Sequence, residues 1–197
     1  MSSRPVLQEI SPLPMLEQTP DEVLILQARQ NPKLFTELYQ RYQQRIYTYH
    51  LSRTSNPTEA EELTSQTFLA ALENLVHYDE KRSFVGWLFG IAQHKLVDYL
   101  RKLYRNVPLE KVENAPSSEP SPEEQVANRL DMAAVARGLQ HLPAEQVEAL
   151  SLRIFGGLSA VQTGMVMGKS EAAVKMLVYR GLRNLQQRLV LNMEVRQ

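Results

Sequence analysis

Residues 158–182 read LSAVQTGMVMGKSEAAVKMLVYRGL, and this stretch decides the fold of the second half of the chain. Gly164 is a small residue on the first of two expected helices, at the point where the helices cross closely. Gly168 lies four residues later in the turn, where glycine adopts a positive backbone φ most easily. Val174 and Leu177 follow at a spacing that buries them against the first helix. The pattern predicts a helix-turn-helix, a motif that inserts its second helix into the major groove of DNA.

The second helix of this motif separates its side chains by type on a helical wheel. One face is apolar and is expected to be buried; it carries Val174, Leu177, Val178, Gly181, Leu182, Leu185 and Leu189. The opposite face carries Ala172, Met176, Tyr179, Arg180, Arg183 and Gln187, with Lys175 at its edge. Lysine and arginine there can contact phosphates or guanine edges. We expect Lys175 and Met176 to read bases and Arg183 to contact phosphate. The alternative is an amphipathic helical hairpin with a solvated basic face.

A second amphipathic stretch, GWLFGIAQHKLVDYLRK, occupies residues 86–102. Its expected buried stripe consists of Phe89, Ala92, Leu96, Leu100 and Leu103. The other side carries Trp87, Ile91, His94, Lys95, Asp98, Arg101 and Lys102. A surface that binds single-stranded nucleic acid needs cations for the phosphate backbone and a flat ring on which unstacked bases can stack. Considered alone, however, a tryptophan at the start of a helix is more often a packing residue.

The remaining start and stop signals are all helical. Capping residues and prolines predict helices that begin at Thr19–Pro20, Asn31–Pro32, Thr58 and Ser83 in the first half. In the second half, helices are expected over 122–141, from Pro143 to Gly156–Gly157, from Ser159 to about Gly168, and from Ser170 to about Leu191. The prediction is therefore an all-α protein with two small helical domains, at 21–104 and 122–192. A polar, proline-rich and flexible linker (105–121) joins them, and a flexible extension (1–20) precedes them. We expect the domains to fold independently, with partners setting their relative placement.

Composition excludes several classes of protein. The 197 residues carry 22 basic and 22 acidic side chains and no cysteine, which excludes disulfides, thiolate metal sites and cysteine nucleophiles. No stretch is long and apolar enough to span a membrane, and the N-terminus lacks the apolar core of a signal peptide, so we expect a cytoplasmic protein. The charge is uneven: residues 79–105 carry six basic and three acidic side chains, and residues 153–197 carry seven and two. The histidines are scattered and no catalytic set emerges, so we expect neither an enzyme nor a metal or other cofactor.

The order of these motifs resembles the extracytoplasmic-function (ECF) group of the sigma-70 family of bacterial sigma factors. AEELTSQTFLAAL (60–72) resembles sigma region 2.2, and FVGWLFGIAQHKLVDYLRK (84–102) resembles regions 2.3 and 2.4. LPAEQVEALSLRIFGGLS (142–159) with the helix-turn-helix resembles region 4. The chain departs from the family at Thr163, where an apolar residue is usual.

The resemblance implies a sigma factor that binds core RNA polymerase, recognises the −10 and −35 promoter elements and promotes DNA melting. Residues expected to face the clamp helices of the largest core subunit are Glu61, Glu62, Leu63, Gln66 and Phe68. The loop 77–85 and its neighbours would engage the −10 element through Lys81, Arg82, Trp87, Lys95, Arg101 and Lys102. The −35 element would be read by Ser170, Ala172, Lys175, Met176, Tyr179, Arg180 and Arg183. Part of region 4 would pack on the flap of the other large core subunit, and an anti-sigma factor is a further potential partner.

Two other readings remain open. The first is a stand-alone helix-turn-helix regulator whose N-terminal half senses a signal or dimerises; it predicts binding to a palindromic operator without polymerase. The second is a helical adaptor that binds only protein, for instance a mimic that sequesters an anti-sigma factor; it predicts no DNA binding.

Overall fold

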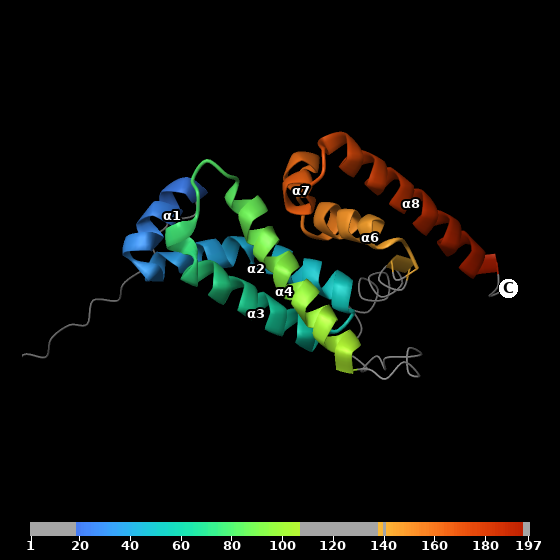
Figure 1. Cartoon of the computed structure of the whole chain (residues 1–197), viewed down its shortest axis with the longest axis horizontal. Helices are drawn as coiled ribbons and strands as arrows, with labels where there is room; N and C mark the ends of the chain where they lie inside the picture. Colours follow the sequence, from blue (N-terminus) through green and yellow to red (C-terminus); the bar gives the residue numbers. More distant parts are fainter. Residues whose placement is uncertain (1–18, 107–137, 140, 195–197) are drawn as a thin grey trace, which may run out of the picture.

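The computed structural model of the chain describes residues 19–106, 138–139 and 141–194, and all regular structure in these ranges is helical (Figure 1). The first half contains α1 (Asp21–Gln30), α2 (Phe35–Thr54), α3 (Pro57–Glu73) and α4 (Phe84–Asn106), with short 3-10 turns at Pro32–Leu34 and Leu75–His77. The second half contains α6 (Ala144–Leu150), its π-helical continuation η3 (Ser151–Phe155), α7 (Ala160–Met167) and α8 (Glu171–Glu194). The all-α prediction is confirmed. The expected extension, most of the linker and most of the helix at 122–141 lie outside the described residues.

Helix ends follow the predicted chemistry in the second half, and in the first half they follow it at Asn31 and Ser83 but not at two other starts. Ser159 and Gln162 form the expected capping box, and Gly168 has the expected left-handed φ of 64°. The predicted caps at Thr19 and Thr58 are wrong. Helix α3 is capped by Asn56, whose side-chain oxygen accepts hydrogen bonds from the backbone N–H groups of residues 58 and 59. Asparagine is a stronger cap than threonine, and the proline that follows it is preorganised for the first helical position.

The four helices of the first half enclose an apolar core. Its fully buried members include Leu24, Ile25, Leu38, Ile46, Tyr49, Leu88, Phe89 and Leu96. The predicted buried stripe of α4 is confirmed for Phe89, Ala92 and Leu96. The predicted burial of Leu103 is wrong, because this residue is 44% exposed in the last turn of α4. Leu88 was not predicted to belong to the stripe, but it is buried.

His50 is a polar residue inside this core. Its Nε2 lies 3.2 Å from Thr67 Oγ1, and the Thr67 hydroxyl donates to the Leu63 carbonyl at 2.7 Å. Because that hydroxyl proton is engaged, Nε2 must donate to Oγ1, and Nδ1 is left as a buried acceptor without a hydrogen-bond partner. Burial, with a smaller contribution from the charge of Arg53, lowers the pKa of His50 to about 3. The imidazole is therefore neutral in the folded protein.

Acid should destabilise the fold through this histidine. The pKa of His50 is about 3 when folded and 6.5 as a model value, so protonation favours the unfolded chain as the pH falls below about 6.5. Between pH 7 and pH 5 we expect this group to cost about 2 kcal/mol of unfolding free energy. Urea denaturation of the wild type and of His50→Leu at both pH values measures the difference. Equal pH dependence in the two proteins would contradict the buried neutral state.

The second half packs directly on the first (Figure 1). Helix α7 lies against α4, and η3 lies against α2. Leu152 and Leu158 join the core of the first half, and the Phe89 ring packs so closely on Gly156 that an added Cβ would lie 2.7 Å from it. The Arg45 guanidinium donates to the Gly156 carbonyl at 2.8 Å and to the Gly157 carbonyl at 3.1 Å. Apolar contacts and hydrogen bonds thus join the two halves of the chain in this structure.

A buried carboxylate lies at the centre of this contact. Glu148 of α6 is 9% exposed and accepts hydrogen bonds from the Tyr49 hydroxyl (2.8 Å), from the Gln93 amide (3.3 Å) and from the Arg53 guanidinium, with which it also forms an ion pair. Burial, together with the negative charge of Glu148, raises the pKa of Tyr49 well above its usual range. The phenol therefore remains a donor to Glu148 at any physiological pH.

Candidate nucleic-acid and protein interfaces

The helix-turn-helix is formed by α7 and α8, and two glycines determine its shape. A Cβ on Gly164 would lie 2.5 Å from the Lys169 carbonyl oxygen, so only glycine permits this approach of the turn to α7. The Lys169 N–H donates to the Gly164 carbonyl at 2.9 Å and closes the turn. Val174 is fully buried, as predicted, and so is Thr163, whose hydroxyl has no hydrogen-bond partner. Thr163 therefore occupies the apolar position that the sequence suggested.

The predicted −35 residues all lie on the exposed surface of α8 and its N-cap: Ser170, Ala172, Lys175, Met176, Tyr179, Arg180 and Arg183. Met176 is 48% and Tyr179 62% exposed, which is unusual for side chains of this size. Lys175 forms an ion pair with Glu171 at 2.6 Å, so its ammonium group must leave that carboxylate to contact DNA. The predicted burial of Leu182 is wrong, since this side chain is 45% exposed beside the basic face.

The predicted −10 residues lie in two groups along α4 and the loop before it. Lys81 and Arg82 are exposed in the loop, and Arg101 and Lys102 are exposed near the end of α4. Lys95 is partly buried, between the two groups in sequence. Trp87 is also partly buried: its ring centroid lies 5.1 Å from that of Tyr78 and 5.7 Å from that of Phe84. The packing role and the stacking role of Trp87 are thus compatible, because the residue packs on two rings and is still partly exposed.

Helix α3 exposes the predicted acidic side chains, but two of the residues that were predicted to contact core polymerase are buried. Glu61, Glu62 and Gln66 are exposed, and the Gln66 amide donates to the Glu62 carboxylate at 2.7 Å. The prediction that Leu63 and Phe68 face a partner is corrected by their burial: they are 2% and 4% exposed and belong to the core, where Phe68 packs edge-on against Tyr39. An apolar residue at either position serves the bundle, and neither can reach a partner's surface without local unfolding.

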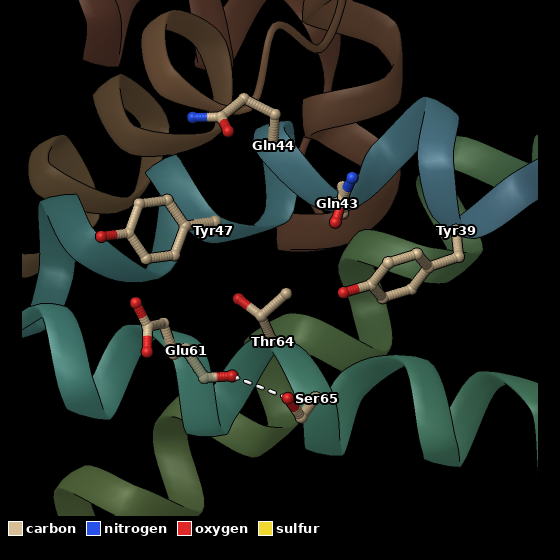
Figure 2. Close-up of a pocket in the computed structure, with 7 residues that line it drawn as sticks. All are labelled: Tyr39, Gln43, Gln44, Tyr47, Glu61, Thr64 and Ser65. Atoms are coloured by element: carbon tan, nitrogen blue, oxygen red, sulfur yellow. Dashed lines mark hydrogen bonds between the residues drawn. The ribbon is translucent and has the colours of Figure 1, made fainter.

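An open groove of about 530 Å³ runs between α2 and α3 beside these acids (Figure 2). Tyr39, Gln43, Gln44 and Tyr47 line it from α2, and Glu61, Thr64 and Ser65 line it from α3. The Ser65 hydroxyl donates to the carbonyl of Glu61 at 3.0 Å, within α3. The lining consists of polar and aromatic side chains.

Two protein-family models match the chain, Sigma-70 region 2 over residues 38–106 and Sigma-70, region 4 over residues 132–185. ECF RNA polymerase sigma factor ShbA of Streptomyces griseus is 34% identical over 64% of this chain and 69% of its own length. The chain belongs to the ECF sigma factors of the sigma-70 family. ECF sigma factor BldN of Streptomyces coelicolor is 36% identical over 77% of the chain, and this match spans 58% of BldN.

A solved structure of CnrH in complex with the cytosolic domain of CnrY superimposes on this sigma factor with a TM-score of 0.67. The two are 27% identical, and the superposition covers 87% of this chain and 97% of CnrH. The region 2 match covers α4, α3 and most of α2, and the region 4 match includes α6, α7 and most of α8. The predicted family, the all-helical architecture and the order of its regions are confirmed.

One surface of the sigma factor was missed by the sequence interpretation. Leu69 (58% exposed) and Leu72 (37%) follow the exposed acids on α3, and Val76 (61%) lies in the 3-10 turn after this helix. The spacing of three residues places Leu69 and Leu72 on one face of α3, and this was the available signal. It was overlooked because a second apolar stripe on a helix is easily assigned to the core.

Among the described residues of the sigma factor, no group of three or more histidine, aspartate or glutamate side chains is placed to hold a metal ion. None of the described helices has the length and apolar character needed to cross a membrane.

Proposed function

We propose that this chain binds core RNA polymerase in the bacterial cytoplasm, directs it to promoters with −10 and −35 elements, and promotes DNA melting. The observation that carries the proposal is the family membership together with the exposure of every expected −35 residue on α8 or at its N-cap. An α-helix fits the major groove, and its exposed side chains then meet the base edges. Lys175 and Met176 lie in the first two turns of α8, where a recognition helix reads bases, and Arg183 lies further along, where it meets phosphate.

Binding of the −10 element is assigned to the loop before α4 and to the exposed cations of α4. Lys81, Arg82, Arg101 and Lys102 supply positive charge for the phosphates of a separated strand. Trp87 supplies a ring for an unpaired base, backed by Tyr78 and Phe84. This arrangement favours single-stranded over duplex DNA, because stacking on an aromatic ring requires a base that has left its own stack.

The core polymerase surface is assigned to the exposed side of α3. Glu61, Glu62 and Gln66 give it negative charge and hydrogen-bonding groups, and the apolar residues Leu69 and Leu72 lie further along the same helix. An apolar anchor surrounded by charged groups is the usual composition of an energetically important contact. Part of region 4 packs on the flap of the other large subunit. CnrH was solved with the cytosolic domain of CnrY, and an anti-sigma factor is included in the proposal as a further protein partner.

Promoter-specific initiation by the purified chain with core polymerase tests the function. A defined run-off transcript that requires both the chain and the promoter is expected. Operator binding by the chain alone, without any dependence on polymerase, would support the stand-alone regulator. Binding to protein without any promoter-dependent transcript would support the adaptor. Either of these results would overturn the proposed function.

Charge reversal combined with loss of the apolar anchor should prevent core binding. For Glu62→Lys with Leu69→Ser we expect core affinity to fall by about 100-fold, since hot-spot side chains are worth about 1–2 kcal/mol each. Both side chains are exposed, so the thermal unfolding temperature should hardly change. Fluorescence anisotropy of labelled chain with core polymerase measures the affinity.

Two further variants separate a loss of core binding caused by charge from one caused by damage to the apolar core. Glu62→Gln removes the charge and keeps the shape, so it should bind better than Glu62→Lys. Leu63→Ala should destabilise the core by about 2–5 kcal/mol without identifying a contact. Undiminished binding by the folded double variant would exclude this face of α3 from the interface.

A further inference from the structure

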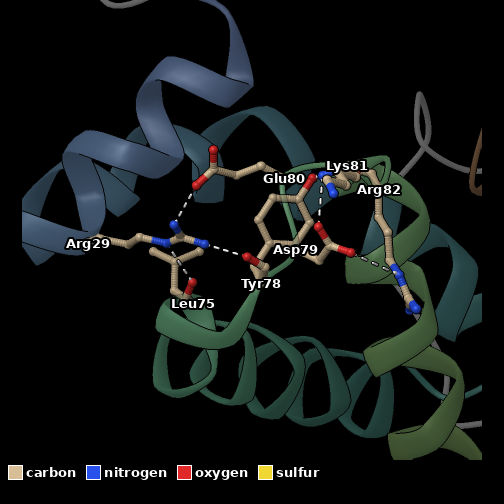
Figure 3. A network of polar contacts seen from close by, with 7 residues as sticks. All are labelled: Arg29, Leu75, Tyr78, Asp79, Glu80, Lys81 and Arg82. Atoms are coloured by element: carbon tan, nitrogen blue, oxygen red, sulfur yellow. Dashed lines mark hydrogen bonds and ion pairs between the residues drawn. The ribbon is translucent and has the colours of Figure 1, made fainter.

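Arg29 of α1 makes three contacts with the loop between α3 and α4 (Figure 3). Its Nε donates to the Leu75 carbonyl at 3.0 Å, one terminal nitrogen donates to the Tyr78 carbonyl, and the other forms an ion pair with Glu80 at 2.6 Å. The partners lie 46 to 51 residues away in sequence. The Arg29 side chain is only 22% exposed, so these contacts are partly shielded from water. A planar guanidinium with several donors is suited to holding two carbonyls and a carboxylate at once.

Tyr78 extends the contact from Arg29 to the expected DNA-binding residues. Its carbonyl is held by Arg29, and its buried phenol donates to the Arg82 carbonyl. Its ring lies against Phe84 (5.7 Å between centroids) and Trp87 (5.1 Å). The backbone of Lys81, in turn, donates to Asp79 at 3.0 Å. The backbone position of Arg82 and the ring of Trp87 therefore depend on a tyrosine that Arg29 holds in place, and Lys81 is bonded to Asp79, the next residue after that tyrosine.

We propose that Arg29 is a positioning residue for promoter melting, which rests on the proposed function of the chain. Arg29 does not reach the DNA. It holds the loop before DNA arrives, so that Trp87, Lys81 and Arg82 do not have to be ordered when the −10 strand separates. Ordering a free loop residue costs conformational entropy, and preorganisation removes that cost from the melting step. The effect should fall on melting, while binding to core polymerase and to the −35 element is left unchanged.

Three variants isolate this role. Arg29→Ala removes all three contacts, and Arg29→Lys keeps the charge but has one nitrogen instead of a fork. Glu80→Gln removes only the ionic contact and keeps both carbonyl bonds. Arg41→Met is the matched control, because Arg41 joins α2 to the start of α1 through its ion pair with Asp21 and its hydrogen bond to the Thr19 carbonyl.

The assay uses the full chain with core polymerase on a promoter, and it measures the permanganate reactivity of thymines in the −10 region. We expect open complex formation to fall about tenfold for Arg29→Ala, about threefold for Arg29→Lys and hardly at all for Glu80→Gln and Arg41→Met. Duplex binding through the −35 element and core affinity should match the wild type in every case. Trp87 is the single tryptophan of the chain, so acrylamide quenching of the free protein reports the loop directly. Quenching should increase for Arg29→Ala and stay unchanged for Arg41→Met.

Each result has a defined meaning. If Arg29→Ala opens the promoter as fast as the wild type, or if Arg41→Met is equally defective, Arg29 only attaches α1 to the bundle and the inference is wrong. If Arg29→Ala does not fold, Arg29→Lys decides in the same way. Failure of the wild type itself to initiate would overturn the proposed function. In that case the quenching of Trp87 still shows whether Arg29 orders the loop.

Discussion

Replacing Gly164 with alanine should unfold the helix-turn-helix and remove −35-dependent transcription. The new Cβ would lie 2.5 Å from the Lys169 carbonyl oxygen, and this atom belongs to the backbone of the turn, which cannot rotate away as a side chain can. Overpacking of this kind costs about 3 kcal/mol. The second core cluster is small, consisting of Leu139, Leu142, Leu150 and Leu185 among the described residues, so a loss of that size is serious. Thermal unfolding and run-off transcription on promoters with and without the −35 element measure the effect.

Gly168 provides a matched control in the same turn. It has a φ of 64°, and an added Cβ would meet nothing within 4 Å. Gly168→Ala should therefore cost only the strain of a left-handed alanine, about 1 kcal/mol. If the two alanine variants were equally stable and equally active, the close approach at Gly164 would have no importance for the motif.

Replacing Glu148 with alanine should release the second half of the chain from the first. Loss of this carboxylate leaves the Arg53 guanidinium and the Tyr49 hydroxyl in a contact where both are largely buried. Removing one partner of a buried ion pair costs about 3–5 kcal/mol, and separation of the halves relieves the penalty by returning Arg53 to water. We therefore expect an increase in the distance between the halves, and each half should keep its helices.

The absence of cysteine makes this distance simple to measure. Ser65→Cys and Gln187→Cys place one dye on exposed positions of each half, and energy transfer between the dyes should fall for Glu148→Ala. Glu145→Ala is the matched control, since Glu145 is 63% exposed and pairs with Lys169 at the surface. Unchanged transfer in Glu148→Ala would show that the apolar contacts of Phe89, Leu152 and Leu158 hold the halves together without it.

Much of the secondary structure follows from local signals that the sequence carries openly. The turn at Gly168, the helix start at Ser159 and the amphipathic helix α4 could all be predicted. Turn conformation, capping and amphipathicity each depend on only a few neighbouring residues. The exposed face of α8 could be predicted for the same reason. Leu63 and Phe68 could not be distinguished from exposed apolar residues, because α3 has apolar side chains on more than one face. Which of these is buried depends on where α2 and α4 lie, and that is a tertiary property.

The contact between the halves was the least predictable feature. Glu148 lies on α6 among residues typical of a solvated helix face, and a glutamate there gives no local sign of burial. Its partners Tyr49, Arg53 and Gln93 lie 55 to 99 residues away. Arg29 poses the same difficulty: a lone arginine in the last turn of α1 resembles an ordinary partner of the helix dipole, and its three acceptors are apparent only in the folded chain.

The packing of α7 on α4 has a consequence for promoter affinity. The positions −10 and −35 are 25 base pairs apart, about 85 Å along B-form DNA. In the structure α8 packs on α7 and α7 packs on α4, and α8 itself is only about 36 Å long. In the proposed function, we therefore expect a chain with separated halves to occupy both elements, so that promoter binding draws on that population. The apparent dissociation constant rises tenfold for every 1.4 kcal/mol, approximately, by which the packed form is favoured. Any partner that binds only the separated form would therefore increase promoter affinity without touching DNA.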